Sequence, residues 1–287
     1  MIDVKNLSKS FGDHLVLDDI SAHISPGEKV VVIGPSGSGK STFLRCLNLL
    51  ETPTKGTITF EGTDITDPKT DINLVRRQMG MVFQHFNLLM QRTVLGNVCF
   101  PLEIVGMSRK DAKKRAMEVL KLVGIADKAN AYPSQLSGGM QRRAELVRAM
   151  INQPKVMMMD EPFRGLDAMT RALMQEYYVR LFEEHRGTNL FVTSELEEGI
   201  FLADRLVVLT NQPCQVKKVM DVNLPRPRTF DMMAMPEYVD IKREVLELLH
   251  DEAMKSFATG AVNAADFLEA YSQLGQDQAQ PRMEGHK

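Results

Sequence analysis

A glycine-rich stretch, Gly34–Ser41, constrains the fold more than any other part of the sequence. It reads Gly-Pro-Ser-Gly-Ser-Gly-Lys-Ser and fits the pattern G-x-x-x-x-G-K-[ST], which surrounds the phosphates of a bound nucleotide. The run Val30–Ile33 before it is typical of a strand buried on both faces of a parallel sheet. Helix-like apolar spacing follows from Thr42 to Leu50. Strand, loop and helix in this order predict a phosphate-binding loop in an α/β fold, rather than a chance run of glycines.

The residue types of this loop fit the chemistry of phosphate binding. Glycines let the chain wrap closely, so that backbone N–H groups point at the β-phosphate, and the positive end of the following helix adds to the attraction. We expect Lys40 to reach the β- and γ-phosphates of ATP and the Ser41 hydroxyl to ligate Mg²⁺. The loop residues expected to bind the nucleotide are Gly34, Pro35, Ser36, Gly37, Ser38, Gly39, Lys40, Ser41 and Thr42.

A second apolar run ends in two adjacent acids. Val156–Met159 reads as a buried strand, and Asp160 and Glu161 follow it. We expect Asp160 to hold Mg²⁺ through its water shell, and Glu161 to orient or deprotonate the attacking water. Two acids could also simply end a strand and cap the next helix, but the apolar run before them and the phosphate loop upstream favour the catalytic interpretation.

The remaining patterns predict how the domain is organised. Met1–Glu28 alternates apolar and polar residues around turn signals, which is typical of short antiparallel strands with one wet face. Phe86–Ile151 is helical in character, and within it Ser108 can cap a helix that Gly124 ends. From Val156 onward strands and helices alternate, as in a parallel sheet covered by helices.

The pattern weakens after Met220. Pro225–Arg228 reads as a linker, Ile241–Lys255 as a helix, and Gly275–Lys287 as a polar tail expected to be disordered. We therefore expect a main domain over residues 1–220, followed by a helical extension and flexible tail over residues 221–287.

Composition excludes several classes of function. A net charge of -2 argues against a nucleic-acid partner bound through a basic field. The N-terminus shows no secretory pattern, and the longest apolar stretches are far shorter than the about 20 residues that cross a bilayer. Any role at a membrane is therefore expected to come through a partner.

A short motif between the phosphate loop and the two acids identifies a family. Leu136–Gly139 precedes a helical run from Met140 to Ile151, and alone it could be any turn before a helix. In chain order with the other motifs it resembles the signature of ABC-transporter ATPases, and this resemblance covers Met1–Met220. It implies a P-loop NTPase (RecA-like) core with an N-terminal antiparallel β subdomain and an α-helical subdomain inserted at about residues 86–151.

The resemblance also implies roles for residues outside the phosphate loop. Phe11 matches the aromatic residue on which adenine stacks, Gln84 the glutamine that touches Mg²⁺ and senses the membrane partner, and Asp167 the acid at the dimer interface. Their structural alternatives are core packing for Phe11, a surface amide for Gln84 and a helix N-cap for Asp167.

The family's partners follow from the same resemblance. Ser137, Gly138 and Gly139 would complete the ATP site of a second ABC ATPase subunit, so that two nucleotides lie between paired ATPases. The helical subdomain would dock transmembrane permease subunits. The implied location is peripheral, at the cytoplasmic face of the inner membrane.

Three positions depart from the family pattern. Ser194 stands where the family has a histidine that contacts the γ-phosphate, Met140 replaces a glutamine or glutamate, and Arg164-Gly165 differs from the common Gly-Ala. A serine can donate a hydrogen bond but cannot carry the charge of an imidazolium. We favour a weakened site that pairs with a different ATPase, while drift that leaves useful turnover is the alternative.

The transported substrate has several candidates. Phe86–Leu89 and Ala131–Pro133 resemble amino-acid and methionine importer ATPases, whereas Glu161–Phe163 and Phe201–Arg205 resemble the nitrate, sulfonate and taurine group. We favour the second group. A lipid-trafficking ABC system and a regulatory subunit with little turnover stay open, and a soluble ABC ATPase of repair or translation is disfavoured because the chain has one motif set and no heptads or cysteine pairs.

Overall fold

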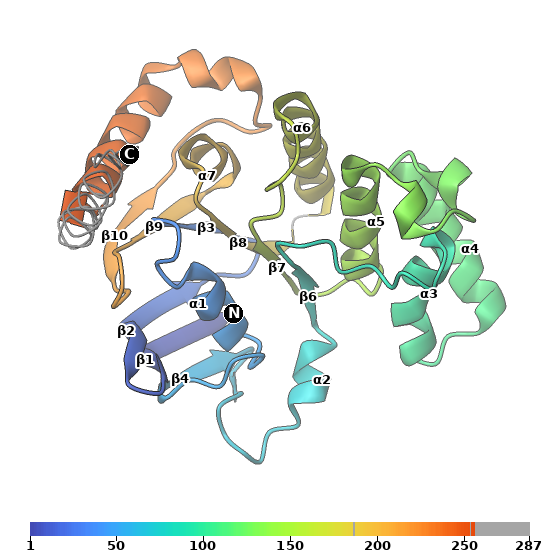
Figure 1. The fold of residues 1–287 in the computed structure, drawn as a ribbon, viewed down its shortest axis with the longest axis horizontal. Helices are drawn as coiled ribbons and strands as arrows, with labels where there is room; N and C mark the ends of the chain where they lie inside the picture. Colours follow the sequence, from blue (N-terminus) through green and yellow to red (C-terminus); the bar gives the residue numbers. More distant parts are fainter. Residues whose placement is uncertain (186, 253, 256–287) are drawn as a thin grey trace, which may run out of the picture.

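A six-stranded sheet forms the centre of the computed structural model, which describes residues 1–185, 187–252 and 254–255 (Figure 1). The strand order is β10–β9–β3–β8–β7–β6, and the pairings are parallel except for that of β10 with β9. The strands are β3 (Lys29–Ile33), β6 (Met79–Val82), β7 (Val156–Asp160), β8 (Thr188–Thr193), β9 (Arg205–Leu209) and β10 (Val216–Asp221). The predicted parallel sheet is thus confirmed.

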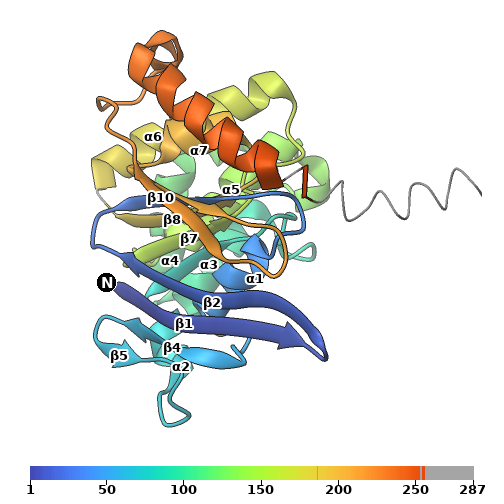
Figure 2. The same ribbon diagram turned by 90° about the vertical axis from the view of Figure 1, so that its left-hand side faces the viewer.

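A smaller antiparallel sheet lies beside it, as the N-terminal alternation predicts. Its order is β2–β1–β4–β5, and Figure 2 shows these strands together below the larger sheet. The apolar faces of this sheet and helix α1 share one core with one face of the larger sheet, to which Met158 contributes. The elements are β1 (Ile2–Phe11), β2 (His14–Ile24), β4 (Lys55–Phe60), β5 (Thr63–Asp64), α1 (Lys40–Cys46) and α2 (Ile72–Arg76).

Helix α1 is shorter than the predicted Thr42–Leu50 and begins earlier. Lys40 is its first residue, directly after the phosphate loop. It ends at Cys46 because Leu49 adopts a left-handed conformation with φ 52°, which does not continue a right-handed helix.

A helical subdomain projects from one side of the large sheet (Figure 1). It has its own apolar core, and the hydroxyls of Thr93, Ser108 and Ser137 accept hydrogen bonds from the first turns of its three α-helices. The helix predicted to follow Ser108 is confirmed, and Gly124 lies just beyond its end with φ 68°. The elements are α3 (Val94–Ile104), α4 (Arg109–Leu122), α5 (Gly138–Met150), η1 (Ala126–Lys128) and η2 (Pro133–Gln135).

The second face of the large sheet is covered by α6 (Ala168–His185), α7 (Leu196–Leu202) and the chain after β10. Met157 and Met159 point into this layer, opposite to Met158, because side chains alternate along a strand. A 3₁₀ turn, η3 (Phe230–Ala234), leads into a C-terminal helix over residues 236–252. This helix starts before the predicted Ile241, since a proline at position 236 suits the first turn of a helix.

The stretch expected to be a linker, Pro225–Arg228, is fixed to the core instead. Arg226 pairs with Asp204 at 2.5 Å and with Glu183 at 3.1 Å. Arg228 is buried and donates to the Ala203 carbonyl at 2.6 Å. This part of the linker interpretation is wrong, because charge pairs that a composition pattern does not reveal hold the segment against α6 and α7. The predicted tail Gly275–Lys287 lies outside the described residues, and the domain boundary at residue 220 stays a prediction.

Candidate nucleotide site

The phosphate loop connects the carboxyl end of β3 to the start of α1, as expected. The Lys40 side chain is buried, and its ammonium donates to the carbonyls of Gly34 at 2.8 Å and Pro35 at 2.7 Å. Burial lowers the pKa of Lys40, while Glu161 and Asp160 act in the opposite direction. Gly39 has φ 112°, and a Cβ there would lie 3.0 Å from side-chain atoms of β2, so this position requires glycine.

The Ser41 hydroxyl and the Asp160 carboxylate are directly joined. Ser41 Oγ donates to Asp160 Oδ1 at 2.6 Å, across from helix α1 to the end of β7. Asp160 is fully buried, its second oxygen Oδ2 has no hydrogen-bond partner, and burial raises its pKa. Arg45 lies 3.7 Å from Oδ2, beyond hydrogen-bond distance. A hydroxyl and a buried carboxylate with an unsatisfied oxygen fit the oxygen ligands that Mg²⁺ prefers.

Gln84 lies at the same edge of the sheet. It follows β6, the parallel neighbour of β7, and Val82 is in register with Met159, the residue before Asp160. The Gln84 side chain is partly exposed. This placement is compatible with the predicted magnesium contact, which stays a prediction.

Glu161 is held in an unusual backbone conformation. Its φ is 44°, in the left-handed region that costs a non-glycine residue free energy, and its N–H donates to the Val192 carbonyl of β8 at 2.8 Å. Ser194 Oγ donates to Glu161 Oε1 at 3.3 Å. An arginine takes the other oxygen: Arg164 Nη1 lies 2.6 Å from Oε2.

These side chains border one hollow together with the phosphate loop. Its volume is about 210 Å³, and Ser36, Glu161, Arg164 and Ser194 all line it. The structure therefore brings together the predicted catalytic residues Glu161 and Ser194 and the phosphate loop. The bond from Arg164 is a feature that the sequence analysis missed, although an arginine three residues after Glu161 was the available signal.

The two other predicted nucleotide contacts are accessible but have different surroundings. Phe11 is 46% exposed at the end of β1, and the Lys9 ammonium lies 4.6 Å from its ring centroid. This exposure argues against the core-packing alternative for Phe11. Asp167 accepts from the Thr170 N–H at 3.0 Å at the start of α6, so the N-cap alternative is observed. That hydrogen bonding lowers the pKa of Asp167, and a further role at a dimer interface stays a prediction.

The signature residues are at the start of α5, outside the hollow that Ser36 and Glu161 line. Ser137 Oγ accepts from the Met140 N–H at 3.4 Å, which caps the helix. A Cβ at Gly138 would lie 3.5 Å from the Phe86 ring, and one at Gly139 would clash with Thr170 at 2.9 Å. Within one chain, these residues do not line the same hollow as Glu161.

A buried ion pair ties the signature helix to the segment after β6. Arg142 is 2% exposed and donates to the carbonyls of Phe83 at 2.7 Å and Gln84 at 2.9 Å. It also pairs with Glu145, one turn along α5, at 2.6 Å. Sequence reasoning missed this link, because nothing local marks Arg142 as different from the partly exposed Arg143 and Arg148 of the same helix.

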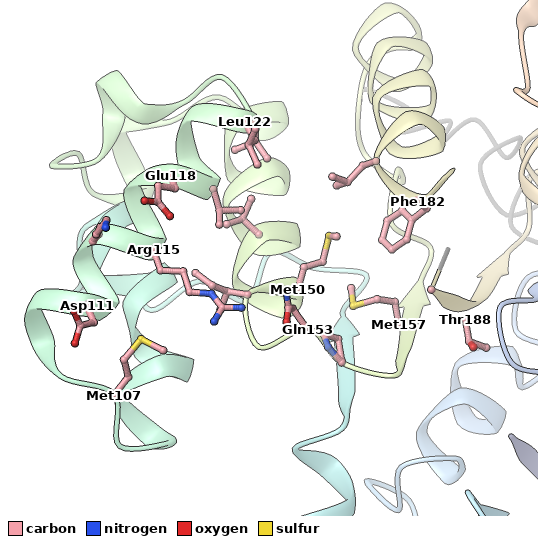
Figure 3. Close-up of a pocket in the computed structure, with 18 residues that line it drawn as sticks. Met107, Asp111, Arg115, Glu118, Leu122, Met150, Gln153, Met157, Phe182 and Thr188 are labelled. Atoms are coloured by element: carbon pink, nitrogen blue, oxygen red, sulfur yellow. The ribbon is translucent and has the colours of Figure 1, made fainter. Parts of the chain in front are cut away.

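A larger hollow lies elsewhere, between α4, the end of α5 and the end of α6 (Figure 3). Its volume is about 840 Å³, and Met157 and Thr188, at the starts of β7 and β8, line it. Asp160 and Ser194 lie at or beyond the other ends of these parallel strands, so the larger hollow is at the opposite edge of the sheet. Size alone does not mark the nucleotide site.

Comparison with known proteins agrees with this geometry. The family model of the ABC transporter matches residues 17–164. The chain is 38% identical over 259 residues to an uncharacterized ABC transporter ATP-binding protein of Methanocaldococcus jannaschii, covering 89% of this chain and 93% of that protein. It is 46% identical over 211 residues to an arginine transport ATP-binding protein of Bacillus subtilis (73% and 87% covered). It is 37% identical over 258 residues to a nitrate import ATP-binding protein of Synechocystis (86% and 94% covered).

A solved structure extends the likeness to three dimensions. A dimeric ATP-binding cassette in a post-hydrolysis state, bound to ADP and phosphate, matches with a TM-score of 0.70 and 33% identity. The match covers 78% of this chain and 100% of that chain. In the part of the chain that the structure describes, none of the helices is long and apolar enough to cross a membrane. The phosphate loop, the Ser41–Asp160 contact, Glu161 and the signature helix thus occur in one fold, and the chain belongs to the ATP-binding proteins of ABC transporters.

Proposed function

We propose that this importer subunit hydrolyses ATP at the site formed by its phosphate loop, Asp160 and Glu161, and that closure of two ATPase subunits on ATP drives transport. The observation that carries the proposal is the convergence of Ser41, Asp160 and Glu161 at the end of β7, beside a buried lysine. A cation held by Ser41, Asp160 and Gln84 would offset the charge of the phosphates during hydrolysis.

The chain's own residues then have distinct roles. The Lys40 ammonium would exchange the carbonyls of Gly34 and Pro35 for oxygens of the β- and γ-phosphates. Glu161 would orient the attacking water and accept its proton, since its carboxylate borders the hollow beside Ser36. Ser194 would contribute a hydrogen bond without a charge. Phe11, exposed at the end of β1, would stack on adenine.

The test is hydrolysis by the intact complex with Glu161→Gln, a change that keeps the side-chain volume. Where the second ATPase subunit is a different protein, its own catalytic glutamate is also replaced by glutamine in all samples, so that turnover reports the site of this chain. We expect hydrolysis to fall at least 100-fold while ATP still binds, as the loss of a catalytic group in this class of reaction implies. Asp240→Asn, on the exposed side of the C-terminal helix, is the control and should leave the rate unchanged. Hydrolysis that survives Glu161→Gln would refute this mechanism.

The second ATPase subunit is the next part of the proposal. Ser137, Gly138 and Gly139 lie outside the chain's own catalytic hollow, and the matched cassette structure is a dimer, which together support a role for these residues in the site of a partner. We favour a different ATPase as that partner, because Ser194 lacks the charge that the family's histidine can carry. A regulatory subunit with little turnover is the extreme form of the same idea.

Mass spectrometry of the native complex, extracted in mild detergent, tests the pairing. One copy of this chain beside another ATPase would support the asymmetric pair, and two copies would contradict it. Ser194→His should raise hydrolysis in the intact complex if the missing charge limits turnover. The same extraction should recover permease subunits from the membrane fraction, since the proposed location is peripheral at the cytoplasmic face.

A nitrate-like solute is the favoured cargo. The nitrate import relative aligns over 258 residues, including the region of the C-terminal helix, whereas the arginine transport relative aligns over 211. The arginine relative is nevertheless more identical over its shorter span, so amino acids are the alternative. Binding-protein-dependent transport by the reconstituted complex should respond to nitrate, bicarbonate, sulfonate or taurine. A response to arginine, glutamine or methionine alone would overturn the preference. If the complex responds to neither group of solutes, a lipid becomes the remaining candidate.

A further inference from the structure

The turn after β7 aims an arginine at the catalytic glutamate. The Arg164 N–H donates to the Glu161 carbonyl at 3.1 Å, which forms a tight turn and places the two side chains on the same side. The guanidinium then reaches Glu161 Oε2 at 2.6 Å, while Ser194 holds Oε1 at 3.3 Å. Each carboxylate oxygen therefore has its own donor.

Of the residues that the structure describes, two arginines and three glutamates line this hollow, and they are paired differently. Glu161, Glu195 and Glu198 line the hollow with Arg164 and Arg171. Arg171 lies 3.8 Å from Glu195 and donates to the Leu166 carbonyl, so it is already engaged away from Glu161. Among the described residues that line this hollow, Arg164 is the cation bonded to Glu161.

A positive charge at this place would assist hydrolysis. A γ-phosphate beside an ionised carboxylate brings two anions together, and a cation between them offsets their repulsion. Ser194 cannot supply that charge. The Arg164 side chain is 54% exposed, so it is free to shift, and a guanidinium has five N–H donors in a planar fork that suits carboxylate and phosphate oxygens together.

We propose that Arg164 is a catalytic residue that supplies the positive charge missing at position 194, by bridging Glu161 and the terminal phosphate of bound ATP. In the structure the guanidinium pairs with Glu161. When ATP enters, the guanidinium keeps one N–H on Glu161 and turns others to a γ-phosphate oxygen. This inference rests on the proposed hydrolysis at the chain's own site.

A double-mutant cycle tests the inference through the kinetics of ATP hydrolysis by the intact complex. The four proteins are wild type, Arg164→Gln, Ser194→His and the double variant. If the second ATPase subunit is a different protein, its own catalytic glutamate is replaced by glutamine so that turnover reports this site. We expect Arg164→Gln to lower kcat on the order of 10-fold or more, with KM for ATP changed less than about 3-fold.

The expected signature is that the histidine makes the arginine dispensable. In the Ser194→His background, Arg164→Gln should lower kcat less than about 3-fold, because an imidazolium then carries the charge. Arg164→Lys should retain more activity than Arg164→Gln, since it keeps a charge without the planar fork. Arg243→Gln is the matched control, because Arg243 is also paired with an acid three residues away, but on the exposed C-terminal helix.

Three outcomes would overturn the inference. An unchanged or raised kcat for Arg164→Gln would show that the ion pair is idle or inhibitory. An equal loss in both backgrounds, or a lower unfolding midpoint for Arg164→Gln, would indicate a structural role. Glu161→Gln distinguishes this failure from failure of the proposed function: if it abolishes hydrolysis while Arg164→Gln does not, the ATPase proposal stands and only this inference falls.

Discussion

Replacing Arg142 by methionine should destabilise the protein strongly, although the new side chain is apolar and similar in length. Arg142 is buried and makes three hydrogen bonds, to the carbonyls of Phe83 and Gln84 and to the carboxylate of Glu145. Its guanidinium also lies 4.8 Å from the ring centroid of Phe86. Burial lowers the pKa of Arg142 and raises that of Glu145, and the attraction between the two charges opposes both shifts.

The magnitude follows from what the substitution leaves behind. Arg142→Met leaves the fully buried Glu145 carboxylate without its ion-pair partner, while the Asn87 N–H still donates to it at 3.3 Å and the more distant charge of Arg148 still favours its ionised form. Removing one partner of a buried ion pair costs about 3–5 kcal/mol, so we expect a loss of about 4 kcal/mol. In Arg142→Met with Glu145→Met the ion pair is removed as a whole, and the loss should fall to about 2 kcal/mol, from backbone groups left without partners and from the lost attraction between Glu145 and Arg148.

Urea unfolding followed by circular dichroism measures these losses, because the chain contains no tryptophan to serve as a fluorescent probe. The rate of hydrogen exchange at residues 83–87 should rise in the single variant, since the two carbonyls that lose their donor are in that segment. A double variant that is less stable than Arg142→Met would refute the reasoning, as would a single-variant loss below about 1 kcal/mol.

Three further predictions concern other buried groups. Burial raises the pKa of Glu198 to about 7, so the native state binds this proton more tightly than the unfolded state does. The free energy of unfolding should therefore fall as pH rises from about 4.5 to 7. Glu198→Gln should remove that fall and add about 3 kcal/mol at pH 8, as measured by urea unfolding at pH 5 and 8. A Cβ at Gly80 would lie 2.3 Å from Met157 Sδ, so Gly80→Ala should cost about 1–3 kcal/mol, whereas Gly187→Ala, with open space around it, should cost less than about 1 kcal/mol. Burial opposes ionisation of Glu252, but hydrogen bonds from Lys255, Asn211 and Lys217 lower its pKa to about 2. Glu252→Gln should therefore increase the rate of hydrogen exchange in the C-terminal helix. In the wild type this rate should increase only as pH falls from about 4.5 to 2.

The sequence predicted the parts of this structure that local patterns encode. The glycines and Lys40 of the phosphate loop lie within one short segment, and a β-branched strand before them fixes their setting. Asp160 and Glu161 were predictable because the run of apolar residues marks a buried strand, and the two acids follow directly at its carboxyl end. Ser194 was singled out by the family resemblance instead, and the structure places it just after β8, at hydrogen-bond distance from Glu161.

What the sequence did not predict depends on contacts between distant segments. Arg142 and Phe83 are joined by a bond that spans 59 positions, and no periodicity within α5 distinguishes a buried arginine from an exposed one. Arg226 reads as part of a polar linker until Glu183 and Asp204 are seen around it. The direction of the Arg164 side chain depends on the turn after β7, which propensities alone do not determine.

The hydrogen bonds inside the phosphate loop have a thermodynamic consequence. Lys40 already donates to two carbonyls, and Ser41 to Asp160, so these two side chains are held by hydrogen bonds within the chain. For these two side chains, nucleotide binding is then an exchange of acceptors rather than a net gain of contacts. Little conformational entropy is lost, because the side chains that bind are fixed beforehand. The enthalpy of ATP binding, measured by titration calorimetry, should consequently be smaller than the number of final contacts suggests.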